Sequence, residues 1–140
     1  MGTALSGSGT EQDPWVLETP PRSSTFEMYL APEADPPAIV CQVKATQLRY
    51  HLRAIDDAVE FLRAQGDWVE LGNADEGKPV KEGSLEAWAR SESNPVGGYY
   101  GFKKGLRGRF GNYVGPLLEH LGHVELEHEA RGNRVRAAAL

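Results

Sequence analysis

The sequence predicts an α+β fold, with a small antiparallel sheet in the N-terminal half followed by a winged-helix-like arrangement of helix, short strand, short helix, long helix and terminal β-hairpin. Three observations lead to this prediction. Short apolar segments of strand period fill the first fifty residues, amphipathic stretches of helical period follow, and the last residues alternate around a turn signal. The 140 residues are enough for one hydrophobic core and too few for two.

The first residues predict a flexible tail. Residues 1–13 are small and polar and offer little apolar surface to bury, so we expect them to stay outside the core. Residues 14–140 are expected to form a single α+β domain. Trp15 begins an extended segment that Pro20 and Pro21 end, and its large ring is expected to fix the tail to the body.

Further segments predict the strands of the N-terminal sheet. Residues 24–30 alternate apolar and polar side chains, which is the period of a half-exposed strand. Residues 38–43 are nearly all apolar and rich in β-branched side chains, as expected of a buried strand. Residues 48–52 are interpreted as another strand, although the spacing of their leucines also fits a helix that begins after Thr46.

The middle of the chain predicts two helices separated by a short strand. Residues 54–65 place their apolar side chains on one face, and Gly66 provides a C-terminal stop. Residues 67–71 fit a short strand. Ser84 is the expected N-cap of a short helix that ends at residue 90.

The clearest helical pattern covers residues 110–121. Its apolar side chains recur at spacings of three and four residues, which gives one continuous stripe. Pro116 lies inside this stripe, and a proline there removes a backbone hydrogen bond and costs about 3 kcal/mol. We therefore expect a kink or a break near Gly115.

The chain is predicted to end in a β-hairpin over residues 124–137, closed by a two-residue Gly-Asn turn. In that register Arg131 faces Arg134, and Glu129 faces Arg136 as a cross-strand ion pair. The hairpin would complete the order of elements found in a winged-helix domain.

The charge is uneven along the chain. Residues 1–93 carry 8 Lys and Arg against 16 Asp and Glu, whereas residues 94–140 carry 7 against 4. An acidic body with a basic C-terminal third permits an anionic partner at that end. Cys41 is the single cysteine, which excludes an internal disulfide, and no stretch approaches the roughly 18 apolar residues of a membrane helix. We expect a cytoplasmic protein with no membrane partner.

The motifs of common enzyme classes are absent or incomplete. Residues 72–78 follow the first part of a phosphate-binding loop, but Pro79 replaces the magnesium-binding hydroxyl and two acidic residues occupy the loop. His120, His123 and His128 are scattered by the predicted geometry, so we expect no metal. No serine or cysteine has the surroundings of a nucleophile. We therefore expect a non-enzymatic domain without a cofactor.

One stretch stands out as a candidate binding surface. Residues 97–113 hold six glycines, several aromatic side chains, four basic ones and no acidic residue. Cations between rings can attract phosphates while the rings stack on bases. The glycines and rings also fit a crowded bend whose aromatics fill the core, which would leave only the cations for binding. The candidate anion- or nucleic-acid-binding residues are Lys103, Lys104, Arg107, Arg109, Arg131 and Arg134.

Two functional hypotheses remain close, because the outer face of the predicted long helix is poor in side chains that read bases. The first is a binding domain whose basic C-terminal surface contacts an anionic partner, with nucleic acid as the first candidate. The second is a protein-interaction or self-association module, such as a homodimer, that covers exposed apolar surface near Trp15, Tyr29 or Trp88.

Several segments of the chain also resemble a known group of proteins. They include "DPWVLETPP", "AIDDAVEFLRAQGDWVELG", "SNPVGGYYGFKKGLRGRFGNYVGPLLEHLG" and "RGNRVRA". Over about residues 10–138 the chain is similar to a family of small bacterial, mostly actinobacterial, proteins without an assigned function. The resemblance implies one bacterial domain and assigns no catalytic or ligand-binding residue.

Overall fold

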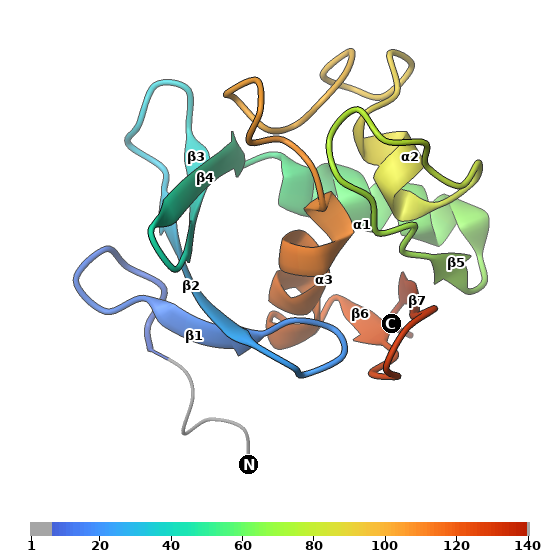
Figure 1. Cartoon of the computed structure of the whole chain (residues 1–140), viewed down its shortest axis with the longest axis horizontal. Coiled ribbons are helices and arrows are strands. Elements are labelled where there is room, and N and C mark those ends of the chain that lie inside the picture. Colours follow the sequence, from blue (N-terminus) through green and yellow to red (C-terminus); the bar gives the residue numbers. More distant parts are fainter. Residues whose placement is uncertain (1–6, 140) are drawn as a thin grey trace.

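The α+β class predicted from the sequence is confirmed by a computed structural model that describes residues 7–139. A four-stranded antiparallel sheet comes first, and helices and a three-stranded sheet follow (Figure 1). In chain order the elements are β1 (Trp15–Glu18), β2 (Thr25–Ala31), β3 (Ala38–Val43), β4 (Thr46–His51), α1 (Ala54–Gln65), β5 (Val69–Glu70), α2 (Leu85–Ala89), α3 (Phe110–His120), β6 (Val124–Leu126) and β7 (Arg134–Ala137).

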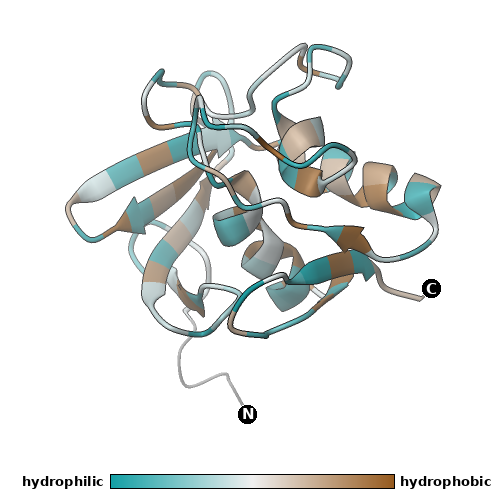
Figure 2. Cartoon of the chain, turned by 45° about the vertical axis from the view of Figure 1, so that its right-hand side comes forward, coloured by the Kyte–Doolittle hydropathy of each residue, from teal (hydrophilic) through white to brown (hydrophobic). Residues whose placement is uncertain are grey.

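The N-terminal sheet is a simple meander in the order β1-β2-β3-β4. Its register aligns Met28 with Cys41 and Cys41 with Leu48, so these three side chains lie in one row on the buried face. The strands accordingly carry bands of alternating hydropathy (Figure 2). Residues 46–51 are a strand, which decides between the strand and the helix that the leucine spacing left open.

Helix α3 lies at the centre of the molecule, between the four-stranded sheet and the small C-terminal sheet (Figure 1). Eight of its 11 residues are buried. The helix runs through Pro116 to His120, so the break expected near Gly115 does not occur. Pro116 is itself buried, and we attribute the continuity to packing on several sides that outweighs one lost backbone hydrogen bond.

The C-terminal sheet has the strand order β5-β7-β6, and its hairpin register differs from the predicted one. Glu125, not Glu129, faces Arg136, because β6 ends at Leu126 and residues 127–133 form the connection. The side chain of Asn133 closes this connection by bonding both the N–H and the carbonyl of Glu129. The predicted two-residue turn, and the Arg131–Arg134 and Glu129–Arg136 pairings that it implied, are therefore wrong.

The first six residues of the predicted tail lie outside the described part of the chain. Within the rest of that tail, Gly9 is buried and its carbonyl accepts a hydrogen bond from Leu30 in β2 at 3.0 Å. Trp15 is also buried, and side chains from both sheets and all three helices belong to one apolar cluster. Within residues 7–139, no helix has the length and apolarity needed to cross a bilayer.

The single core makes a prediction about Leu117, which is fully buried in α3. Leu117→Ala should lower the free energy of unfolding by about 2–5 kcal/mol, because it leaves a cavity where the packed elements meet. Urea denaturation followed by tryptophan fluorescence and by far-UV circular dichroism should show one coincident transition. Leu121→Ala, at a half-buried position, is the milder control. Two separate transitions would contradict the single core.

Candidate functional site

The glycine-rich stretch is held in place by a buried carboxylate, that of Glu86. Ser84 caps α2 as predicted, because its hydroxyl accepts the N–H of Ala87 at 3.1 Å. This start places Glu86 in the first turn with only 1% of its surface exposed. Its two oxygens accept the N–H groups of Phe110 and Gly111 at 2.9 and 3.0 Å. Glu86 thus serves as the N-terminal cap of α3 from another helix.

Arg90, one turn further along α2, completes this buried pair. Its guanidinium lies 3.1 Å from the Glu86 carboxylate and donates to the carbonyl of Ala74 at 3.0 Å, with longer bonds to the carbonyls of Asp75 and Lys78. Burial raises the pKa of Glu86, and the two N–H groups and Arg90 oppose that effect. The pair therefore fixes the 72–79 loop as well as the start of α3.

The 72–79 loop in turn holds the glycine-rich stretch through Glu76. Its carboxylate accepts the backbone N–H groups of Gly105 and Arg107 at 3.0 and 2.7 Å, and it pairs with the Arg107 guanidinium at 3.0 Å. The Arg107 guanidinium also lies over the Tyr99 ring, 4.3 Å from its centroid. The acidic loop, whose residues do not fit a phosphate-binding motif, therefore binds the basic stretch and holds it in place.

Two glycines of the stretch are required by close chain passage. A Cβ on Gly108 would lie 2.3 Å from the backbone nitrogen of Glu76, and one on Gly101 would lie 2.7 Å from Cγ of Arg107. Meanwhile Tyr100 and Phe110 are buried and pack their rings 5.6 Å apart. This part of the stretch matches the predicted crowded bend whose aromatic side chains fill the core.

The structure separates the six predicted binding residues into two groups. Three of them form ion pairs with carboxylates: Arg107 with Glu76 at 3.0 Å, Arg109 with Asp75 at 2.6 Å, and Arg134 with Glu127 at 2.7 Å. The other three, Lys103, Lys104 and Arg131, are exposed and form no ion pair with a residue of the described range 7–139. A paired, partly neutralised arginine attracts an anion less strongly than a free cation does.

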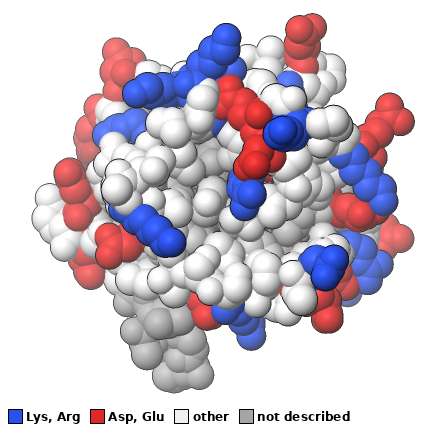
Figure 3. All heavy atoms as spheres, in the orientation of Figure 1, with Lys and Arg blue, Asp and Glu red and all other residues white. Residues whose placement is uncertain are grey.

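Arg131 does not share a surface feature with the two lysines. It lines a pocket beside Pro20 and Asn112, whereas Lys104 lines a different one beside Val43 and Tyr113. On the face shown in Figure 3, basic and acidic side chains are interspersed over much of the surface. The six residues therefore do not act as one continuous positive patch.

Arg49 of β4 is a neighbour of the lysines that no local sequence pattern identified. The loop after Tyr100 runs along β4, where the N–H of Phe102 donates to the Arg49 carbonyl at 3.0 Å and Gly101 bridges to Tyr50. The Arg49 side chain is exposed and forms no ion pair within the described residues. Its outward place in an alternating strand was readable from the sequence, but its pairing with a loop some fifty residues later was not.

The Phe102 ring lies beside this cation group. It is half-buried and packs edge-on against His51, with 4.6 Å between the ring centroids. Burial and the nearby Arg53 cation lower the pKa of His51. Arg49, Lys103 and Lys104 with the Phe102–His51 ring pair are called the β4 basic surface below.

Two of the three histidines near the C-terminus have structural surroundings. His128 lies after β6 rather than within it, and its ring bonds the Glu119 carboxylate at 2.6 Å and the Pro20 carbonyl at 2.8 Å. The ring of His120 packs edge-on against Trp15 at 5.3 Å. Between residues 7 and 139, no three side chains of the His, Cys, Asp and Glu types gather as metal ligands would.

Comparison with known proteins gives a family and no function. The model described as "Family of unknown function (DUF6855)" matches residues 7–138. No curated protein matches the chain, and no solved structure does. The surfaces described above therefore have no template in a characterised relative.

Replacement of Glu86 tests the buried cap. Glu86→Gln keeps the side-chain size but turns an amide donor toward one of two backbone donors, so it should lower the free energy of unfolding by about 1–3 kcal/mol. Urea denaturation at pH 7 measures the change, with Glu82→Gln in the exposed neighbouring loop as the control. Equal stability of both variants would show that the carboxylate does not cap α3.

Replacement of Glu76 tests the loop clamp through its pH dependence. Burial acts to raise the pKa of Glu76, but the hydrogen bonds from Gly105 and Arg107 outweigh it and leave the pKa below its ordinary value of 4.5. The stabilisation is therefore full above that value and is lost as the pH falls through the lowered pKa. Glu76→Gln should be less stable than the wild type at pH 7. The difference between their free energies of unfolding should decrease as the pH is lowered.

The measurement for Glu76 is the free energy of unfolding from pH 7 to pH 3 for the wild type and the variant. Glu33→Gln, at an exposed glutamate outside the ion pairs of the described residues, is the control and should change little. A wild-type–variant gap that stays constant as the pH falls would mean that the Glu76 carboxylate does not hold the glycine-rich stretch.

Proposed function

We propose that this chain, which belongs to the family of unknown function DUF6855, is a non-enzymatic binding domain that holds a single-stranded nucleic acid on the β4 basic surface. The observation that carries the proposal is that three exposed cations, outside any ion pair of residues 7–139, come from adjoining backbone segments beside a half-exposed ring. Backbone phosphates attract such cations, and a base can stack on the ring.

The fold supports this proposal by fixing the cations relative to one another. The hydrogen bond from Phe102 to Arg49 and the bridge from Gly101 to Tyr50 tie the lysine loop to β4. The Glu76 carboxylate holds the following residue, Gly105. A binding surface whose backbone is already ordered loses less conformational entropy when a ligand binds.

The burial of α3 and the ion pairs of the hairpin favour a single-stranded nucleic acid over a duplex as the ligand. If the helices and the β5-β7-β6 sheet were used as a winged helix, α3 would be the helix that enters a groove, yet most of its residues are buried. The cations of the hairpin are also neutralised, because Arg134 pairs with Glu127 and Arg136 with Glu125. Basic side chains instead gather at the upper edge of Figure 3, over the end of β4 and the neighbouring loop.

The salt dependence of binding tests the proposal. Fluorescence anisotropy with a labelled oligothymidylate should show binding at low ionic strength that weakens with a log–log slope of about −2, given about −0.7 for each single-strand phosphate neutralised. Lys103→Gln with Lys104→Gln should weaken binding strongly and reduce the slope. Arg134→Gln with Arg136→Gln removes the same charge from paired positions and should leave binding nearly unchanged.

Protonation of His51 adds a further expectation for the wild type. Because its pKa is lowered, the ring is neutral at pH 7 and gains a positive charge only as the pH falls through that lowered value, so binding should strengthen in that range. The proposal is wrong if no salt-sensitive binding occurs at low ionic strength. It is also wrong if the paired-arginine variant loses as much binding as the lysine variant.

A further inference from the structure

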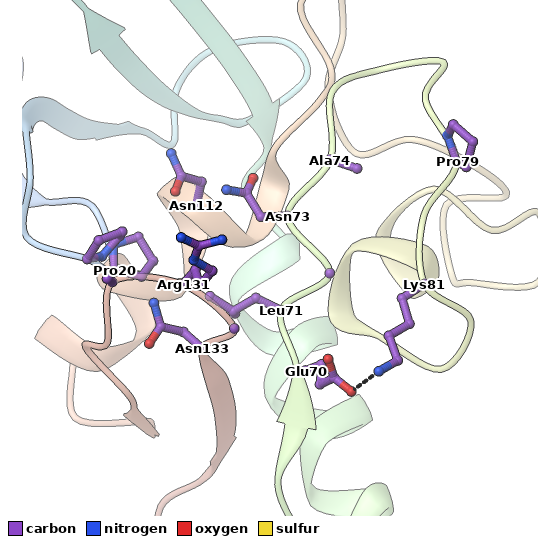
Figure 4. Close-up of a pocket in the computed structure, with 14 residues that line it drawn as sticks. Pro20, Glu70, Leu71, Asn73, Ala74, Pro79, Lys81, Asn112, Arg131 and Asn133 are labelled. Atoms are coloured by element: carbon purple, nitrogen blue, oxygen red, sulfur yellow. Dashed lines mark hydrogen bonds and ion pairs between the residues drawn. The ribbon is translucent and has the colours of Figure 1, made fainter.

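A second surface feature is independent of the β4 basic surface. It is a pocket of about 400 Å³ between α3, the loop after β5, the prolines that follow β1, and the connection before β7. Figure 4 shows its lining residues, among which amide side chains and one guanidinium predominate on one side. Pockets of this size hold small molecules.

Asn112 places a polar side chain in the wall of this pocket. It lies in the first turn of α3, and only 7% of its surface is exposed. Its amide interacts with the Tyr113 hydroxyl and so lowers the pKa of that group, against the larger raising effect of burial. Between residues 7 and 139 the fully buried side-chain nitrogen without a hydrogen-bond partner is Nε of Arg90, so the Asn112 amide remains accessible from the pocket that it lines.

Asn133 lies in the same wall of the pocket, and its amide forms hydrogen bonds within the protein. It is buried to the same degree as Asn112, and both ends of its amide bond the backbone of Glu129 at 2.6 and 3.0 Å. Its role is to shape the connection before β7. The Asn112 side chain lies near those of Asn73 and Arg131 in Figure 4.

The charge of the pocket comes from Arg131. Its guanidinium points toward the space between the amides of Asn73 and Asn112 (Figure 4) and forms no ion pair within the described part of the chain. The other two charged residues of the lining, Lys81 and Glu70, pair with each other. The pocket therefore presents one uncompensated positive charge next to amide donors.

We propose that this pocket binds a small organic oxyanion, with its carboxylate or phosphate on Arg131 and the Asn112 amide. A guanidinium presents two parallel N–H groups that match two oxygens of such an anion, and each amide NH₂ adds a donor. Pro20, Pro21 and Leu71 line the apolar part of the same pocket, which suits a short carbon skeleton. The site shares no residue with the β4 basic surface.

The test is an NMR titration of the ¹⁵N-labelled full chain with three probes: succinate, inorganic phosphate, and neutral succinamide. We expect saturable shifts of the Asn112 side-chain NH₂ and the Arg131 Nε–H signals with at least one anion, and none with succinamide. A response to succinate alone identifies a carboxylate ligand, and a response to phosphate alone identifies a phosphate ligand. Arg131→Gln, at an exposed position that should not affect folding, is expected to weaken binding at least tenfold.

Two further variants complete the design. Asn112→Leu keeps the volume and removes the amide, so it should also weaken anion binding, and its far-UV spectrum shows whether it is folded. Arg63→Gln removes an exposed arginine of α1 outside the pocket lining and should bind like the wild type. Absence of saturable shifts with both anions overturns the proposal. Equal weakening by Arg63→Gln and Arg131→Gln overturns it as well.

Discussion

The buried carboxylate of Glu86 is the interaction on which the rest of the structure depends. A charge in the interior is costly unless hydrogen bonds and an opposite charge compensate it. Here two backbone N–H groups at the start of α3 and the Arg90 guanidinium provide that compensation. Because α3 is the central helix and Arg90 also holds the 72–79 loop, the Glu86–Arg90 pair joins α2, α3 and the loop that supports the glycine-rich stretch.

This arrangement decides which basic side chains are free to act. The acidic loop uses its carboxylates to hold Arg107 and Arg109, so these arginines stabilise the fold and offer little to an external anion. Lys103 and Lys104 form no ion pair with that loop, although Lys104 lines a pocket together with Asp75 and Glu76, and the preceding Phe102 bonds the backbone of Arg49. Similar residues in one short segment therefore have different roles, and the difference arises from a loop about thirty residues earlier.

Local sequence patterns predicted the elements of the fold well, but they could not predict pairings between segments that are distant in the chain. Helix 54–65, the Ser84 cap and the stripe of α3 depend on residues a few positions apart, and the structure has all three. The hairpin register could not be predicted from the sequence pattern, because an alternating pattern is unchanged by a shift of an even number of residues. The β4 basic surface and the Asn112 pocket each combine distant segments, so no local pattern could reveal which cations are outside ion pairs or which side chains share a pocket.

Amide hydrogen exchange at Phe110 and Gly111 tests the central claim most directly. These two N–H groups lie in the first turn of α3, where a helix supplies no internal acceptor, so only an external one can protect them. If the Glu86 carboxylate binds both, they should exchange as slowly as the amides at the centre of α3, which open only on global unfolding. Exchange at the rate of an exposed loop would show that α3 begins uncapped, and the proposed connection between the two helices and the binding loop would be refuted.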